Sequence, residues 1–165
     1  MVTGANSGIG YEAALDFASR GASLALVCRS EQRGRKACDA IIEITGNTKV
    51  ELYLADFCVL ASVASLAAEL LRDYPHIDVL CNNAGSVSAT REITKEGFET
   101  TFAANHLSGF LLSQLLLPLL ETAGAKGEAR VVFTSSLGHK NSPLDFDDFN
   151  LEQGYSGLKA YGRSK

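Results

Sequence analysis

The chain has 165 residues, a formal net charge of −4, 46 % hydrophobic residues and 21 % charged residues. This length and composition are typical of one globular domain and argue against a disordered chain. The chain is acidic overall and lacks the excess of basic residues that nucleic-acid binders carry, so we expect no nucleic-acid partner.

Four cysteines, at positions 28, 38, 58 and 81, show neither CxxC nor Cys/His ligand spacing. We therefore expect no metal site, and reduced thiols as in a cytoplasmic protein. The most apolar stretch, 110–120, is too short for a membrane span and contains Gln114 and Pro118. The opening MVTGANSG is not a signal peptide. An anchor upstream of Met1 in a longer chain stays an open alternative.

Short apolar runs alternate with segments of helical period. The runs predict parallel strands, buried on both faces, over 2–3, 23–28, 50–54, 77–81 and 130–134. Helices are predicted over 9–20, 31–44 and 60–72, over 95–120 as two helices or one bent near Pro118, and from about 156 onward. This alternation predicts a single-domain α/β fold with a doubly wound, Rossmann-like parallel sheet.

Two features suggest a piece of a larger domain. Only two strand residues precede the first loop, whereas a central strand needs about five. The chain also stops at Lys165 inside a predicted helix. We expect residues 1–165 alone to be a poor catalyst, because the first strand is nearly absent and a terminal helix frays.

The segment 3–10 reads Gly-x-x-x-Gly-x-Gly between a strand end and a helix start. Gly4, Gly8 and Gly10 would let the backbone turn tightly and let a diphosphate approach the helix N-terminus. The spacing differs from the usual GxGxxG. On its own, such a loop is equally compatible with a simple tight turn.

The end of the second strand bears on the choice of cofactor. The sequence there is Val-Cys-Arg-Ser, with no carboxylate before Glu31. An acid at this point bonds a ribose 2′-hydroxyl, whereas Arg29 offers a bidentate fork to a 2′-phosphate. This predicts NADP(H) in preference to NAD(H). The alternative is a solvated arginine after a strand.

The ends of the next two strands also carry polar residues. Asp56 follows the third strand and could accept from an adenine amino group, or cap a helix. Asn83, Ala84 and Gly85 follow the fourth strand, at the edge where such sheets bind ligands. These residues suit either a backbone pressed against a cofactor or a turn.

Tyr161 and Lys165 are four residues apart and share one face of the last predicted helix. A nearby ammonium favours the phenolate form of a tyrosine, which makes it a usable general acid and base. Ser135 and Ser136 follow the fifth strand and could point a hydroxyl into the same cleft. Asn105, a polar residue among apolar ones, could hold a water.

Together these residues resemble the short-chain dehydrogenase/reductase family over the whole chain. TGANSGIG resembles its cofactor loop, which adds Asn6, Ser7 and Ile9 to the expected cofactor contacts. Residues 82–85 resemble its NNAG motif, and Tyr161 to Lys165 its YxxxK motif. Asn105, Ser136, Tyr161 and Lys165 match its catalytic tetrad in order. VCRS and NSPLDFDDFN resemble the retinol-dehydrogenase-like branch, although Ser136 precedes Tyr161 by more residues than is common in the family.

The resemblance implies a role for each member of the tetrad. Tyr161 would exchange a proton with the substrate oxygen, and Lys165 would bond the nicotinamide ribose. Ser136 would polarise the carbonyl, and Asn105 would position a relay water. Tyr161 and Lys165 are thus expected to contact the cofactor as well as to catalyse.

The implied activity is an NADP(H)-dependent alcohol dehydrogenase or carbonyl reductase acting on a retinoid, steroid or lipid aldehyde or ketone. Family members form homodimers or tetramers, and they extend further, so the chain would lack most of a carboxyl-terminal substrate-binding part. The alternative is a truncated, inactive dinucleotide-fold protein that acts as an interaction or regulatory module.

Overall fold

The computed structural model describes all 165 residues. Its five strands form one sheet in the order β3-β2-β1-β4-β5, with β1 at Val2–Thr3, β2 at Leu24–Cys28, β3 at Val50–Leu54, β4 at Val79–Asn82 and β5 at Arg130–Phe133. Every neighbouring pair is parallel, which confirms the predicted doubly wound sheet. The strand order reverses between β1 and β4, and such sheets bind ligands at the carboxyl ends of the strands at this point.

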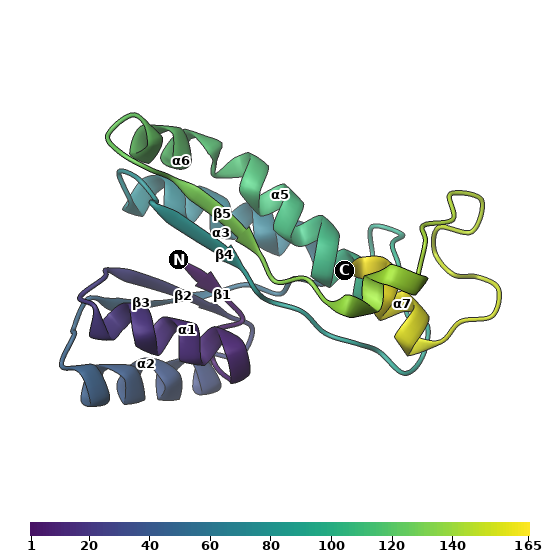
Figure 1. Ribbon diagram of the computed structural model, residues 1–165, viewed down its shortest axis with the longest axis horizontal. Coiled ribbons are helices and arrows are strands. Elements are labelled where there is room, and N and C mark those ends of the chain that lie inside the picture. The colour runs from purple at the N-terminus through teal and green to yellow at the C-terminus, as the bar shows by residue number, and fades with distance from the viewer.

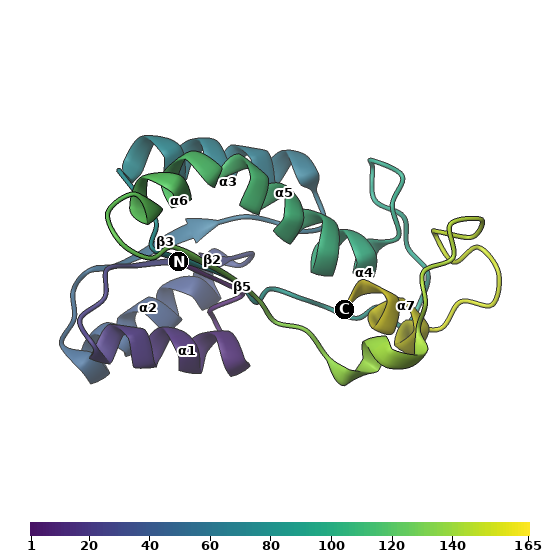
Figure 2. The ribbon, with the colours of Figure 1, turned by 45° about the horizontal axis from the view of Figure 1, so that its top comes forward.

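Helices cover both faces of the sheet (Figure 1). Helices α1 (Gly8–Ser19) and α2 (Glu31–Thr45) lie on one face, and α3 (Leu60–Asp73), α5 (Ser108–Leu115) and α6 (Leu117–Gly124) on the other, as Figure 2 shows. Residues of β2 alternate between the two cores. Leu24 and Leu26 join the core under α1 and α2, whereas Ala25 and Val27 join the core under α3 and α5. Burial on both faces is thus confirmed for β2.

The predicted helical segment 95–120 is divided in the structure. Helix α4 begins only at Thr100 and ends at Phe102, the π-helix η1 runs over Ala103–Leu107, and α5 and α6 follow. The predicted start at Lys95 is wrong because residues 94–97 form a turn, in which Gly97 has φ +90°. No single helix is long and apolar enough to span a bilayer; only the pair Thr100–Leu115 and Leu117–Gly124 taken together, bent by 59°, has the required length and composition.

The fifth strand departs from its prediction. All four residues of β5 are exposed, with Phe133 at 51 % of its full exposure. The strand lies at the edge of the sheet with β4 as its one neighbour. Helix α5 approaches it at Phe133, where a Cβ at Gly109 would lie 3.3 Å from the ring, but this contact leaves the strand's residues exposed. The fourth strand begins at Val79 rather than residue 77, because the N–H of Ile77 bonds the carbonyl of Leu119 instead.

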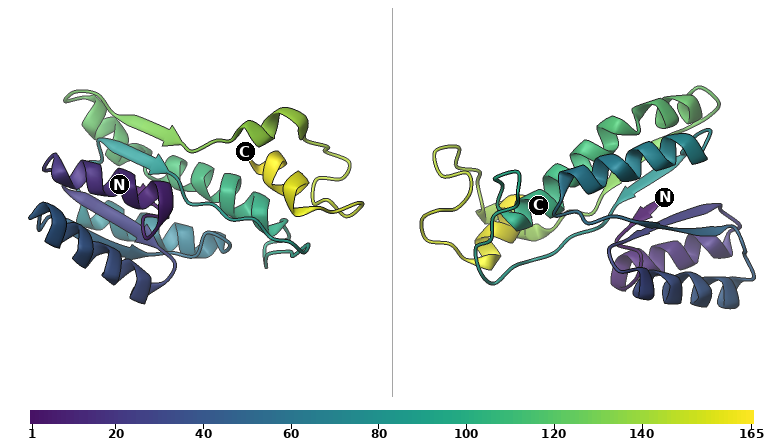
Figure 3. Two further views of the ribbon diagram at one scale, coloured as in Figure 1. Left: turned by 60° about the horizontal axis from the view of Figure 1, so that its bottom comes forward. Right: turned by 180° about the vertical axis from the view of Figure 1, so that it is seen from behind.

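The last elements lie beyond the carboxyl end of β5 (Figure 3). They are the 3₁₀ helix η2 (Leu137–Asn141) and helix α7 (Gly157–Ser164). The hydroxyl of Ser156 caps α7 by accepting from the N–H of Lys159 at 3.2 Å. The segment with the predicted tyrosine and lysine is therefore placed next to the edge where ligands bind.

Candidate active site

The loop 3–10 joins β1 to α1 and lies against the segment that follows β4. Gly4 has φ +67°, a region that residues with side chains rarely adopt. A Cβ at Gly4 would lie 2.9 Å from the Cα of Ala84, and one at Gly10 would lie 2.5 Å from the carbonyl oxygen of Gly4. The backbone therefore forms a cradle that side chains would fill.

The remaining loop residues gather at the start of α1. Ser7 is the N-cap but makes no side-chain capping bond, so N–H groups of the first turn stay available to an anion. Gly8 has φ +56°, and Ile9 beside it is 72 % exposed. This arrangement fits the diphosphate of a dinucleotide.

Thr3 and Asn83 fasten the ends of three strands together. The Oγ1 of Thr3 accepts from the N–H groups of Asn83 at 3.0 Å and Ala84 at 2.9 Å. The Asn83 side chain donates to the carbonyl of Thr3 at 3.0 Å and accepts from the hydroxyl of Thr134 at 3.2 Å. Thr3 was not among the predicted site residues. Its place at the end of a strand, directly before the glycine loop, was the signal available in the sequence.

A pocket of about 170 Å³ opens where β1, β2 and β3 end. Predicted cofactor residues from four segments line it, namely Gly4, Asn6, Arg29, Asp56, Ala84 and Gly85. A larger pocket, of about 380 Å³, lies at the opposite, amino ends of β2 and β4 and contains none of the predicted site residues. The convergent polar groups therefore favour the smaller pocket as the cofactor site.

Two arginines in this pocket have no acidic partner. Arg29 follows β2, and Arg33, in the first turn of α2, lines the same pocket. The nearest carboxylate in sequence, Glu31, is held by the guanidinium of Arg35 at 2.7 Å. The arginines that do form ion pairs are Arg20, Arg35, Arg72, Arg91, Arg130 and Arg163.

Arg33 was missed in the sequence. The signal was present, because a helix N-terminus favours acids over cations. Two arginines flank this helix start, the acid between them, Glu31, is engaged by Arg35, and neither arginine forms an ion pair with Asp56 across the pocket; this indicates an anionic ligand.

Asp56 lines the pocket but does not cap a helix. The N-cap of α3 is Val59, and the Asp56 carboxylate instead accepts from the N–H of Cys58 at 2.9 Å. Its own N–H donates to the hydroxyl of Ser62 at 3.0 Å. The helix-cap interpretation is therefore wrong. The contact with an adenine amino group stays a prediction.

Two thiols of the pocket are held in the protonated form. Burial raises the pKa of Cys28 to about 11, and burial together with the Asp56 carboxylate raises the pKa of Cys58. An unfolded thiol ionises near 9.0. As pH rises, these thiols therefore lose their protons at a lower pH in the unfolded chain than in the folded chain. The stability that the protonated thiols confer is present below pH 9 and is lost as pH rises toward 11.

We accordingly expect the urea midpoint of unfolding to fall between pH 8 and pH 10.5, and to fall less in Cys28→Ala. Unfolding followed by circular dichroism at both pH values measures this. An equal fall in the variant would contradict the assignment to Cys28.

Helix α7 places Tyr161 and Lys165 together. The Lys165 ammonium lies 5.7 Å from the centroid of the Tyr161 ring and donates to the carbonyl of Thr134 at 2.8 Å. The backbone carbonyl of Tyr161 accepts a hydrogen bond from the Ser164 hydroxyl. The Tyr161 hydroxyl itself forms no hydrogen bond within the protein, so it is available to a substrate.

The two serines after β5 have different environments. Ser135 donates its hydroxyl to the carbonyl of Lys165 at 3.0 Å, whereas Ser136 accepts from the N–H of Gly138 at 3.1 Å and caps η2. A Cβ at Gly138 would lie 3.5 Å from the Ser136 oxygen and 3.7 Å from the ring of Tyr161. Ser136 thus lies near Tyr161 with its hydroxyl proton uncommitted, which favours it over Ser135.

Asn105 lies in the π-helix and is almost fully engaged. Its Oδ1 accepts from the N–H of Ser86 at 2.7 Å, and its Nδ2 donates to the Ser86 carbonyl at 2.9 Å and to the Ser164 hydroxyl at 2.8 Å. π-Helical turns often mark functional sites. The relay-water role stays a prediction, and because both N–H groups are used, only an oxygen of Asn105 could bind the water.

Fold and site together define a doubly wound α/β domain of the dinucleotide-binding class. A family model described as short chain dehydrogenase matches residues 1–146, so the chain belongs to the short-chain dehydrogenase/reductase family.

Similar proteins support this assignment. The chain is 41 % identical to dehydrogenase/reductase SDR family member 13 of Bos taurus, with 100 % of the chain and 43 % of the relative covered. It is 38 % identical to human retinol dehydrogenase 13, with 100 % and 49 % covered. A Shigella flexneri structure described as a short chain dehydrogenase complexed with NADP superposes with a TM-score of 0.75 at 30 % identity, covering 99 % of this chain and 64 % of that one. The chain thus spans about half the length of the curated relatives it matches.

Proposed function

We propose that the protein is an NADP(H)-dependent oxidoreductase that interconverts an alcohol and a carbonyl on an apolar substrate. The observation that carries the proposal is the pair Arg29 and Arg33, which line one pocket and form no ion pair. Solved relatives complexed with NADP or NADPH support the same cofactor.

The residues fit a dinucleotide. The cradle around Gly4 and Gly10 and the start of α1 would hold the diphosphate, and the two arginines would bind a 2′-phosphate. The bound cofactor supplies or accepts the hydride. Tyr161 then donates or removes the proton at the substrate oxygen, and Ser136 donates a hydrogen bond to that oxygen. Lys165 provides the positive charge beside the phenol.

Exposed apolar side chains in the same short segments as Tyr161 and Ser136 favour an apolar substrate. Leu158 lies three residues before Tyr161, hence on the same helix face, and is 82 % exposed. Leu137 directly follows Ser136 and is 77 % exposed. The retinol dehydrogenases among the relatives support a retinoid or another lipid alcohol or aldehyde.

Calorimetric titration with NADPH and NADH tests the cofactor. We expect NADPH to bind at least about tenfold more tightly, since charge-assisted phosphate contacts are the strong ones. NADPH oxidation is then followed with retinal, a steroid ketone, a long-chain aldehyde and a short polar aldehyde as the control. Equal affinities would reject the cofactor assignment. Tight binding without turnover of any substrate would favour a regulatory binding module.

A further inference from the structure

Residues 142–156 connect η2 to α7 without forming a helix or strand. We call this segment the strap. Figures 1 and 3 show it looping out at the end of the molecule where α7 lies. Irregular segments of this length inside a compact domain are either mobile linkers or functional loops. The polar contacts of the strap distinguish the two.

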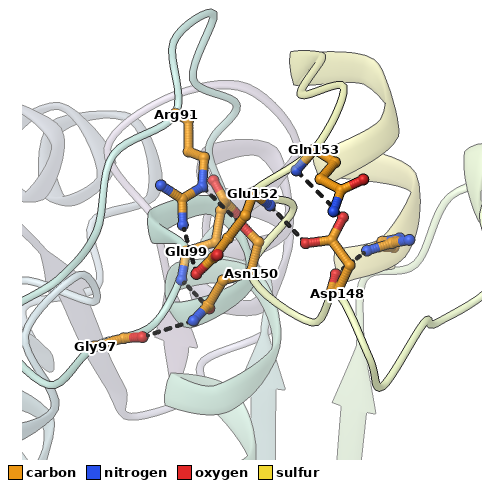
Figure 4. A network of polar contacts seen from close by, with 8 residues as sticks. Arg91, Gly97, Glu99, Asp148, Asn150, Glu152 and Gln153 are labelled. Atoms are coloured by element: carbon orange, nitrogen blue, oxygen red, sulfur yellow. Dashed lines mark hydrogen bonds and ion pairs between the residues drawn. The ribbon is translucent and has the colours of Figure 1, made fainter.

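Asn150 fastens the strap to the segment that leads into α4 (Figure 4). Its Nδ2 donates to the carbonyl of Gly97 at 3.0 Å, and its Oδ1 accepts from the N–H of Glu99 at 2.9 Å. Its backbone carbonyl accepts from the guanidinium of Arg91 at 2.9 Å. Three bonds from a single residue to one neighbouring segment indicate a fixed attachment.

The next residue provides independent support. Leu151 has φ +52°, the one positive φ among non-glycine residues, and it is only 2 % exposed. A large side chain in this backbone region is strained. Such strain persists only where the surrounding contacts over-determine the conformation, and it concentrates at functional sites.

Glu99 connects the strap to the helical segment that contains Asn105. Its side chain is buried, and its two oxygens accept from the N–H groups of Thr101 at 3.0 Å and Phe102 at 2.8 Å. These bonds cap the helical segment whose π-helix presents Asn105. The position of Asn150 thus bears on the start of the helix that carries Asn105.

The strap is also tied to α7, two residues before Asn150. Arg163, which lies between Tyr161 and Lys165, donates to the carbonyl of Asp148 at 2.8 Å. Its side chain is 6 % exposed, and it also approaches Asp145 at 3.9 Å. An isolated helix of eight residues is marginal, so α7 depends on such ties for its position.

We propose that Asn150 is a positioning residue of the reaction, which sets α7, and with it Tyr161, against the helix that carries Asn105. Along the strap the two ties act in series, because Arg163 joins α7 to the strap and Asn150 joins the strap to the cap of α4. The direct hydrogen bond from Asn105 to Ser164 is a separate tie, which is the same in every variant compared below. The proposal rests on the proposed function for its effect on turnover, but not for its effect on structure.

The test compares Asn150→Ala, Arg163→Met and the double variant in the full chain. Asn141→Ala, an exposed asparagine beside the strap without a side-chain hydrogen bond, is the matched control. We expect each single variant to lower kcat roughly tenfold, because small misplacements of reacting groups are costly. NADPH affinity should stay within about twofold, since neither residue lines the cofactor pocket. The effects of ties in series are not additive. We therefore expect kcat of the double variant to lie within about twofold of kcat of the slower single variant.

Unchanged kcat in Asn150→Ala, or losses that multiply in the double variant, would overturn the proposal. If the unmodified protein turns over no substrate, the proposed function fails while the strap remains testable by hydrogen exchange. Asn150→Ala must then speed amide exchange both at Thr101 and Phe102 and in residues 157–164. Faster exchange confined to the strap overturns the proposal. Should Asn150→Ala not fold, Arg91→Met removes one bond to Asn150 and must show the same pattern at smaller size.

Discussion

In a chain of its relatives' full length, replacing Tyr161 by phenylalanine is expected to lower turnover by about 100-fold or more, the range that general acid–base catalysis supplies. The phenol hydroxyl forms no hydrogen bond within the protein, and the Lys165 ammonium lies 5.7 Å from the centre of its ring, so removal of the hydroxyl breaks no bond of the fold. Stability and NADPH affinity should therefore stay nearly unchanged. Steady-state NADPH oxidation, calorimetric titration and thermal unfolding of the variant measure the three quantities.

Two further variants show whether the loss is specific. Tyr74→Phe removes a hydroxyl that donates to Glu51 at 2.6 Å, near the amino ends of the strands and away from the candidate site, and should retain turnover. Lys165→Ala should reduce both turnover and NADPH affinity, because its ammonium lies beside the phenol and is expected to reach the cofactor. Activity of Tyr161→Phe above about a tenth of the original would exclude the general-acid role.

The parallel α/β architecture could be predicted because short stretches of the sequence indicate its strands and helix ends. Runs such as 24–28 are apolar throughout, and helix ends carry local signals such as Gly46, which caps α2 with φ +70°. The glycine loop and the Tyr161–Lys165 spacing are equally local. Each lies within a few residues of sequence, so neither needed knowledge of the tertiary structure.

What could not be predicted depends on contacts between distant segments. The exposure of β5 depends on which elements cover its faces, which its apolar content does not encode. The bonds of Asn150 to Gly97 and Glu99 join residues more than 50 positions apart. The π-helix around Asn105 likewise has no sequence period of its own.

The arginine pair shows how the two kinds of information combine. Arg29 could be predicted because it follows a strand at a known point of the fold. Arg33 joins it only because α2 begins at Glu31, so that its first turn brings Arg33 to the pocket. That Glu31 is occupied by Arg35 becomes visible only in the structure. A cofactor preference inferred from a single residue is thereby strengthened to one that rests on two.

Arg29→Asp is therefore expected to reverse the cofactor preference. Loss of a charge-assisted bidentate contact, together with repulsion of a 2′-phosphate by the new carboxylate, should weaken NADPH binding by roughly 100-fold. The same carboxylate can accept from a ribose 2′-hydroxyl, so NADH binding should hold or improve. Arg33→Ala should weaken NADPH binding by about tenfold and leave NADH unaffected. Titration of each variant with both cofactors measures the switch.

The matched control is Arg35→Ala, on the same helix turn but bound to Glu31 and outside the pocket. It should change neither affinity by more than about twofold, since an exposed i,i+4 pair contributes little. If Arg29 and Arg33 hold the 2′-phosphate, NADPH affinity should fall in the variants of those two residues alone. Equal losses in all three would mean that the pocket attracts anions only through its general positive charge.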